Sequence, residues 1–97
     1  MYRYTKMFEQ IIGENEVVAV SSANIHALTY QCINQTPYNY VAIMQAKFHA
    51  LFKLYYNYFV EHPSMDETLL KKMTDEISSD ALIIRYAYYT KNYSSTS

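Results

Sequence analysis

The sequence has one glycine, one cysteine, two prolines and no tryptophan among its 97 residues. A single glycine excludes the glycine-rich loops that hold phosphate in P-loop and dinucleotide-binding proteins. A single cysteine excludes an intramolecular disulfide, and with it the class of small secreted proteins that are held together by disulfides. We therefore expect a cytoplasmic protein whose fold depends on a hydrophobic core.

Charge of either sign is scarce as well, with eight Lys and Arg against nine Asp and Glu and a net charge of −1. The basic residues are scattered, so no electrostatic footprint for nucleic acid is visible, which argues against that class of partner. The longest apolar-rich run, 40–60, contains Lys47, His49 and Lys53, which are too polar for a lipid-facing span. The first ten residues lack the apolar run of a secretory signal. We expect no transmembrane segment and no export.

Tyrosine is abundant instead, with 12 residues in a chain that is 51% hydrophobic. A tyrosine ring can fill a core or anchor a partner at low entropic cost. This hydrophobic fraction is typical of globular proteins, and the chain length has room for one domain. We therefore expect a single helical domain over 1–97, in which the polar residues 92–97 form a flexible tail.

The first and the central helix have recognisable boundary signals. Apolar residues at helical spacing predict a helix over about 2–12, and Gly13 follows as its expected C-terminal cap. Thr36 is a favourable N-cap and Pro37 a favourable first residue for the central helix. Apolar positions then recur every three or four residues, which predicts a helix to about residue 60 that packs against neighbours on most sides. These positions are Val41, Met44, Phe48, Leu51, Tyr55 and Tyr58.

The second half of the chain contains two further boundaries. Pro63 ends the central helix, and the Ser-Met-Asp-Glu segment 64–67 has the pattern of a capping box. Because the connection is short, the two helices that it joins are expected to be antiparallel. Another cap at 78–80 predicts a break before the last helix. The fold class predicted from these signals is an all-α antiparallel bundle of four or five helices.

Two segments with strand propensity leave a second fold open. Residues 17–20 include three valines, and residues 82–90 are rich in isoleucine and tyrosine. If these segments paired, the fold would be a small α+β structure with a two-stranded sheet. The absence of hairpin turn signals favours helices. In that case the Ser21-Ser22 pair is the expected N-cap of the second helix.

No arrangement of residues indicates catalysis. Cys32 and the histidines do not form a recognisable nucleophile and base with a third orienting group. The histidines, His26, His49 and His62, are too far apart in sequence for a zinc motif. Paired carboxylates at 66–67 and 75–76 fit helix capping and a solvated helix face. We expect no enzyme activity, no metal site and no cofactor.

A second population of tyrosines lies near the two ends of the chain. The aromatic residues of the central helix are expected to fill the core, whereas the terminal tyrosines exceed what a thin core needs. Exposed tyrosine beside arginine is typical of the residues that dominate binding energy at interfaces. The candidate partner-binding residues are Tyr2, Arg85, Tyr86, Tyr88, Tyr89 and Tyr93.

Residues 54–89 contain a tyrosine-rich helix end, a short turn, an amphipathic helix over 66–77 and the sequence Ile-Arg-Tyr-Ala-Tyr at 84–88. This order resembles the C-terminal half of bacteriocin immunity proteins of lactic acid bacteria, small cytoplasmic four-helix bundles whose ends often contain an Arg-Tyr-Gly-Tyr-like stretch. The chain departs from the pattern at Ala87, where the family has glycine, and in its shorter first helix. The resemblance implies that Arg85 and the tyrosines after it recognise a complex of bacteriocin and receptor, without catalysis.

Taken together, the sequence predicts a small non-enzymatic protein-binding module, acting as an inhibitor, adaptor or immunity-type factor of bacterial or phage origin. One alternative is a self-associating structural protein, for example a homodimer, because the segment 40–60 has more apolar surface than short neighbouring helices cover. A less favoured alternative is a nucleic-acid-binding regulator, since Tyr55, Tyr56 and Tyr58 near Lys53 resemble a base-stacking platform.

Overall fold

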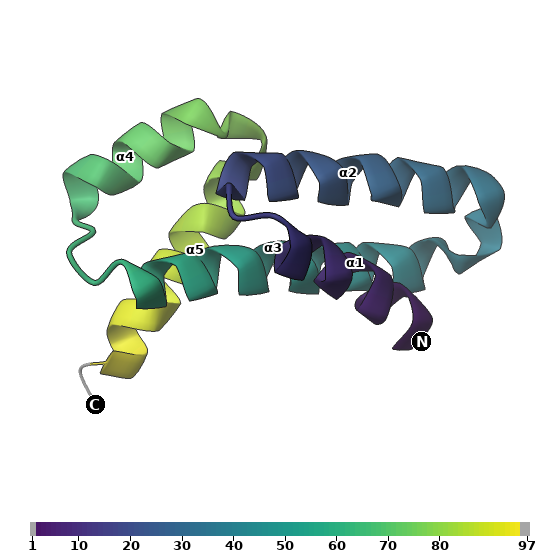
Figure 1. Ribbon diagram of the computed structural model, residues 1–97, viewed down its shortest axis with the longest axis horizontal. Helices are drawn as coiled ribbons and strands as arrows, with labels where there is room; N and C mark the ends of the chain where they lie inside the picture. Colours follow the sequence, from purple (N-terminus) through teal and green to yellow (C-terminus); the bar gives the residue numbers. More distant parts are fainter. Residues whose placement is uncertain (1, 96–97) are drawn as a thin grey trace. The chain divides into compact units, whose positions relative to one another are not determined.

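Helices make up almost all of the part of the chain that the computed structural model describes, which is the backbone of residues 2–95 and the side chains of residues 3–94 (Figure 1). The all-α helical bundle predicted from the sequence is confirmed. Two 3-10 turns, η1 and η2, join helices at Pro37–Asn39 and Ser78–Asp80. Between residues 2 and 95 the chain forms five helices, α1 (Tyr2–Glu14), α2 (Val18–Gln35), α3 (Tyr40–Glu61), α4 (Glu67–Glu76) and α5 (Ala81–Ser95).

The alternative with a two-stranded sheet is wrong. Residues 18–20 begin α2, with Val17 as their N-cap, and residues 82–90 lie inside α5. No strand occurs between residues 2 and 95. The physical reason is the period of burial: α5 buries Ile84, Ala87 and Tyr88, which share one side of a helix but would point to both faces of a strand.

The chain forms two compact units, residues 1–51 and 52–97, and the boundary between them falls inside α3. In the first unit α1 packs against α2, and η1 leads the chain into the first half of α3. In the second unit α4 packs against α5, with η2 between them. That the two units act as one domain stays a prediction.

The buried stripe of α3 differs from the seam that the sequence predicts. Leu51 and Tyr55 are fully buried as expected, but Val41 and Phe48 are exposed. A seam with a period of 3.5 residues drifts by about 20° per heptad around a straight α-helix. The predicted positions therefore coincide with the buried face along only part of α3. The buried α3 residues are Ile43, Ala46, Ala50, Leu51, Leu54, Tyr55 and Phe59.

Two of the predicted caps are wrong, and a third has the predicted position without the side-chain bond. Gly13 lies within α1 and has no positive φ; the Asn15 side-chain amide ends this helix instead, donating to the carbonyl oxygen of Ile11 at 2.9 Å. The Ser21-Ser22 pair lies inside α2 and is buried. Thr36 is the N-cap of η1, with Pro37 at its first position, as expected for the entry to α3. Its side chain makes no capping bond there, because its hydroxyl donates to the carbonyl oxygen of Cys32 at 2.9 Å and so closes α2.

The boundaries of α4 and α5 follow the sequence more closely. The capping box predicted at 64–67 is wrong in its cap residue: Asp66, and not Ser64, is the N-cap of α4, and its Oδ1 accepts a hydrogen bond from the backbone N–H of Leu69 at 3.0 Å. The break predicted at 78–80 is present as η2. Helix α5 continues to Ser95 and therefore enters the segment 92–97. The flexibility of that tail stays a prediction.

Candidate functional site

Helix α5 has apolar side chains on two opposite faces. The inner face consists of Ile84 and Ala87, which are fully buried, and Tyr88, which is 6% exposed. The outer face follows a spacing of four, three and four residues, which aligns side chains along one side of an α-helix. We call this outer face the tyrosine face; its members and their exposed fractions are Leu82 (79%), Tyr86 (56%), Tyr89 (46%) and Tyr93 (83%).

The inner face of α5 is held by aromatic packing within the second unit. The ring of Tyr88 meets that of Phe59 edge to face, with 5.3 Å between the ring centroids. Its hydroxyl lies 3.5 Å from the carbonyl oxygen of Met65, at the long limit for a hydrogen bond. Tyr88 is therefore a core residue of this unit and presents little surface to a partner.

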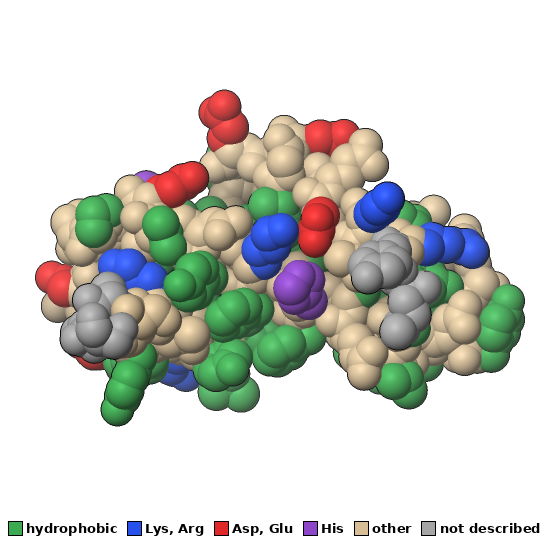
Figure 2. Space-filling view, turned by 90° about the horizontal axis from the view of Figure 1, so that it is seen from below, with side chains coloured by type: hydrophobic (Ala, Val, Ile, Leu, Met, Phe, Trp, Pro, Cys, Tyr) green, Lys and Arg blue, Asp and Glu red, His purple; other side chains and the backbone are tan. Residues whose placement is uncertain are grey.

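The tyrosine face continues onto the second half of α3. The ring of Tyr86 lies against that of Phe52 with centroids 5.2 Å apart, and Phe52 in turn lies 5.7 Å from Tyr56. Both α3 rings are half-buried. Figure 2 shows hydrophobic side chains gathered in the left half of the view, where α5 and this part of α3 lie. The rings of α3 support Tyr86 from one side and extend the apolar surface.

A carboxylate marks the opposite edge of the tyrosine face. The hydroxyl of Tyr89 donates to the carboxylate of Glu67, the first residue of α4, with oxygen–oxygen distances of 3.0 and 3.2 Å. Because the proton is held by this carboxylate, the pKa of Tyr89 is raised above its ordinary value of 10.0. The bond fixes the Tyr89 ring and keeps an acidic group beside it.

Arg85 lies on the same edge, one helical turn before Tyr89. It is exposed, and the described part of the chain gives its guanidinium no ion pair. The cation is therefore available to an acidic group outside this chain.

The candidate residues from the sequence thus divide into three groups. Arg85, Tyr86, Tyr89 and Tyr93 are exposed on α5, whereas Tyr88 is buried. Tyr2 is the first described residue of α1, but its side chain lies outside the described part of the chain. Leu82 was not predicted from the sequence, although its spacing of four, seven and eleven residues from the three exposed tyrosines was the signal that would have found it.

A buried polar pair lies elsewhere in the second unit. The hydroxyl of Tyr55 donates to Oδ2 of Asp80 at 2.6 Å, and both side chains are almost completely buried. A buried carboxylate is stable only when it is hydrogen-bonded, and such charge-assisted bonds are short and strong. The pair anchors η2 to α3. It also removes Tyr55 from the base-stacking platform considered from the sequence, because a buried ring cannot stack on a base.

Three of the side chains weighed for catalysis or metal binding have defined local surroundings. Cys32 is buried. His49 Nε2 lies 4.0 Å from the carboxylate of Glu9, and the exposed His62 stacks on Tyr58 with ring centroids 4.1 Å apart. Among the described side chains, no group of three or more His, Cys, Asp or Glu is placed to hold a metal ion.

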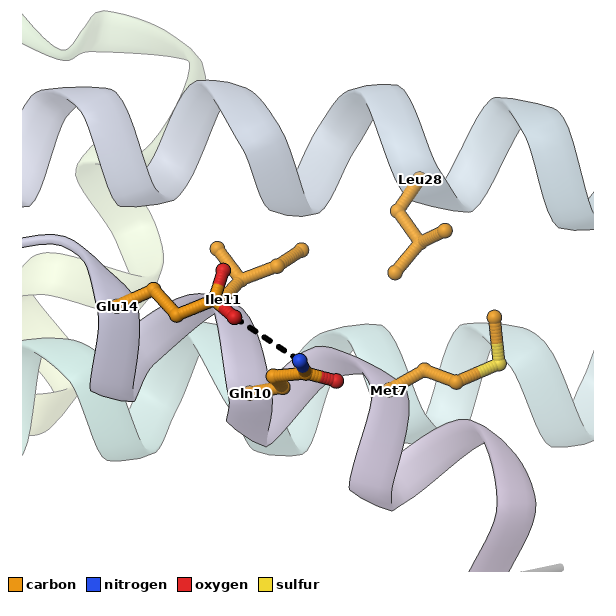
Figure 3. Close-up of a pocket in the computed structure, with 5 residues that line it drawn as sticks. All are labelled: Met7, Gln10, Ile11, Glu14 and Leu28. Carbon is orange, nitrogen blue, oxygen red and sulfur yellow. Dashed lines mark hydrogen bonds between the residues drawn. The ribbon is translucent and has the colours of Figure 1, made fainter.

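An open pocket of about 320 Å³ lies between α1 and α2 (Figure 3). Its two polar lining residues are hydrogen-bonded to each other, since the Gln10 side-chain amide donates to the Glu14 carboxylate at 2.9 Å. The rest of the lining is apolar. It contains no reactive group, and we assign no chemistry to it. The lining residues are Met7, Gln10, Ile11, Glu14 and Leu28.

Comparison of the chain with protein-family models, curated proteins and solved structures finds no match. Between residues 2 and 95, none of the helices combines the length and the apolar character needed to cross a membrane.

Proposed function

We propose that this chain is a small, non-enzymatic protein-binding module whose binding surface is the tyrosine face together with Arg85. One observation supports this proposal above the others: α5 exposes four large apolar side chains in a line while its opposite face is buried. A helix that is apolar on both sides needs cover on both sides, and isolated exposed apolar residues do not form such lines.

The chemistry of the surface suits protein recognition. Tyrosine and arginine are enriched among the residues that dominate binding energy, because they offer large contact areas with polar ends. Contacts with Phe52 and Glu67 already hold Tyr86 and Tyr89 in place. Ordering of these two rings on binding therefore costs less entropy than ordering of free side chains.

An immunity-type factor is the specific role that the resemblance suggests, with inhibitor and adaptor as the wider class. The position where the chain departs from the immunity-protein pattern, Ala87, is fully buried and so lies away from the proposed surface. The proposed factor is cytoplasmic and encoded by a bacterium or a phage. Its expression in a sensitive lactic acid bacterium is expected to protect that bacterium from a bacteriocin. Arg85→Ala is expected to remove the protection. If cells that express the parent chain stop growing with every bacteriocin of a panel, as cells that express Arg85→Ala do, the immunity role is rejected.

Photo-crosslinking tests the wider proposal. A photoreactive phenylalanine analogue at position 93 is compared with one at position 38, a tyrosine of η1 that is 84% exposed and so matches Tyr93 in accessibility. In host cells, position 93 should form a discrete crosslinked species that Arg85→Glu abolishes. Equal products from both positions, or none from position 93, would contradict the proposed surface.

A further inference from the structure

We propose that, when no other partner is bound, the tyrosine face binds a second copy of this chain, with the two α5 helices antiparallel about a two-fold axis. This inference rests on the proposed function in one respect, that the tyrosine face is a binding surface. It adds the occupant, the register and the charged contacts, each of which follows from the residues of α5 and α4.

The spacing of the tyrosine face is self-complementary. Its steps of four, three and four residues read the same in both directions along α5. A two-fold interface requires the same patch on both copies. With the axis between residues 87 and 88, Leu82 lies against the partner's Tyr93, and Tyr86 against the partner's Tyr89. All four outer residues are then covered.

The charges fit the same arrangement. Glu67 lies beside Tyr89, and Arg85 lies on that same edge of the face. A two-fold axis perpendicular to α5 keeps this edge on the same side in both copies. Since Tyr86 lies opposite the partner's Tyr89, the neighbouring Arg85 faces the partner's Glu67, and the symmetry forms this ion pair twice. A parallel pairing would place Arg85 beside the uncharged Ile83 and Tyr86 of the second copy.

The size of the surface approaches that of a standard interface. A large apolar or aromatic side chain presents about 200 Å² when fully exposed, so the tyrosine face leaves on the order of 500 Å² open. Arg85 and the half-buried Phe52 and Tyr56 extend it towards the roughly 800 Å² per partner of a standard interface. The ion pairs lie at the rim, where charges contribute more to register and specificity than to affinity.

Light scattering and charge exchange test the dimer. The parent chain should give twice its mass of 11.4 kDa at high micromolar concentration. Arg85→Glu and Glu67→Arg should each weaken self-association about tenfold or more, and their combination should restore it. Lys72→Glu and Glu76→Arg make the same charge changes at exposed positions of α4 and should have no effect. If Glu67→Arg lowers helicity, Glu67→Gln removes the charge alone.

Disulfide trapping tests the register. In a Cys32→Ala background, chains with Leu82→Cys are mixed with chains with Tyr93→Cys and oxidised. Crosslinks between position 82 of one chain and position 93 of the other should predominate over crosslinks between like positions.

A mass of one chain at all concentrations, unaltered association in both charge variants, or equal trapping of like positions would overturn the dimer. If the chain is monomeric while position 93 still captures another protein, the proposed function survives and only this inference fails. If the chain is monomeric and position 93 captures no other protein, the proposed function and the dimer both fail.

Discussion

The two faces of α5 contain similar residues but have different roles. The inner face, with Ile84 and Tyr88, is enclosed by the second unit, whereas Leu82 and Tyr89 on the outer face are open to solvent. Tyr88 and Tyr89 are neighbours in sequence, yet one packs on Phe59 and the other is bonded to a surface carboxylate. Position around the helix, and not residue type, therefore decides whether a tyrosine stabilises the fold or presents a surface.

Truncation on each face should give the largest difference. Tyr88→Ala removes a buried ring and should destabilise the protein by about 3 kcal/mol or more. Tyr89→Ala removes a half-exposed ring and should cost less than about 1 kcal/mol. Urea unfolding at low micromolar concentration measures both without a contribution from self-association. Equal losses at the two positions would show that the faces are not distinct.

Removal of one buried hydroxyl should give an intermediate effect. Tyr55→Phe removes the hydrogen bond of 2.6 Å that Tyr55 donates to the buried Asp80 carboxylate and should cost about 1–3 kcal/mol. Tyr30→Phe, the same change at an exposed position of α2, serves as the control and should be neutral within about 0.5 kcal/mol. Thermal or urea unfolding of the two variants gives the answer. A neutral Tyr55→Phe would show that the bond does not stabilise the inner structure.

The smallest effect concerns two tyrosine hydroxyls, that of Tyr89 on the outer face of α5 and that of Tyr4 in α1. The hydrogen bond to Glu67 raises the pKa of Tyr89, whereas hydrogen bonds with Thr36 and Asn39 lower the pKa of Tyr4 in α1. Stability from a raised pKa is present below the ordinary value of 10.0 and is lost as the pH rises through the folded value. In an ultraviolet titration, Tyr89→Phe should reduce the late phase and Tyr4→Phe the early phase. The opposite assignment would contradict both hydrogen-bond patterns.

Local signals explain which parts of the fold were predictable. Pro63 ended α3, Asp66 lay within the predicted capping segment, and the break at 78–80 had its own polar cluster. The wrong cap predictions have a local cause, because a nearby residue makes the capping bond. The Asn15 side chain closes α1 where Gly13 was expected to do so. A single sequence does not show which of two nearby residues will make the capping bond.

The candidate surface was only partly predictable for a different reason. Arg85 and three of the terminal tyrosines are exposed as expected, but burial of Tyr88 depends on Phe59, which lies on another helix. The Tyr55 and Asp80 pair likewise joins residues 25 positions apart. Such contacts depend on how helices pack, and spacing within one helix does not specify them. The helical spacing of α5 would have identified Leu82 as a member of the tyrosine face, whereas composition alone did not.

The most direct test of the account is the light-scattering mass of the double variant Leu82→Ser and Tyr93→Ser. These are the two most exposed members of the tyrosine face, and they lie opposite each other in the proposed dimer. The account predicts a chain with the helical circular dichroism of the parent and a monomeric mass of 11.4 kDa, under conditions where the parent has twice that mass. Retention of the parent mass, or loss of helicity, would contradict the separation of folding and binding between the two faces of α5.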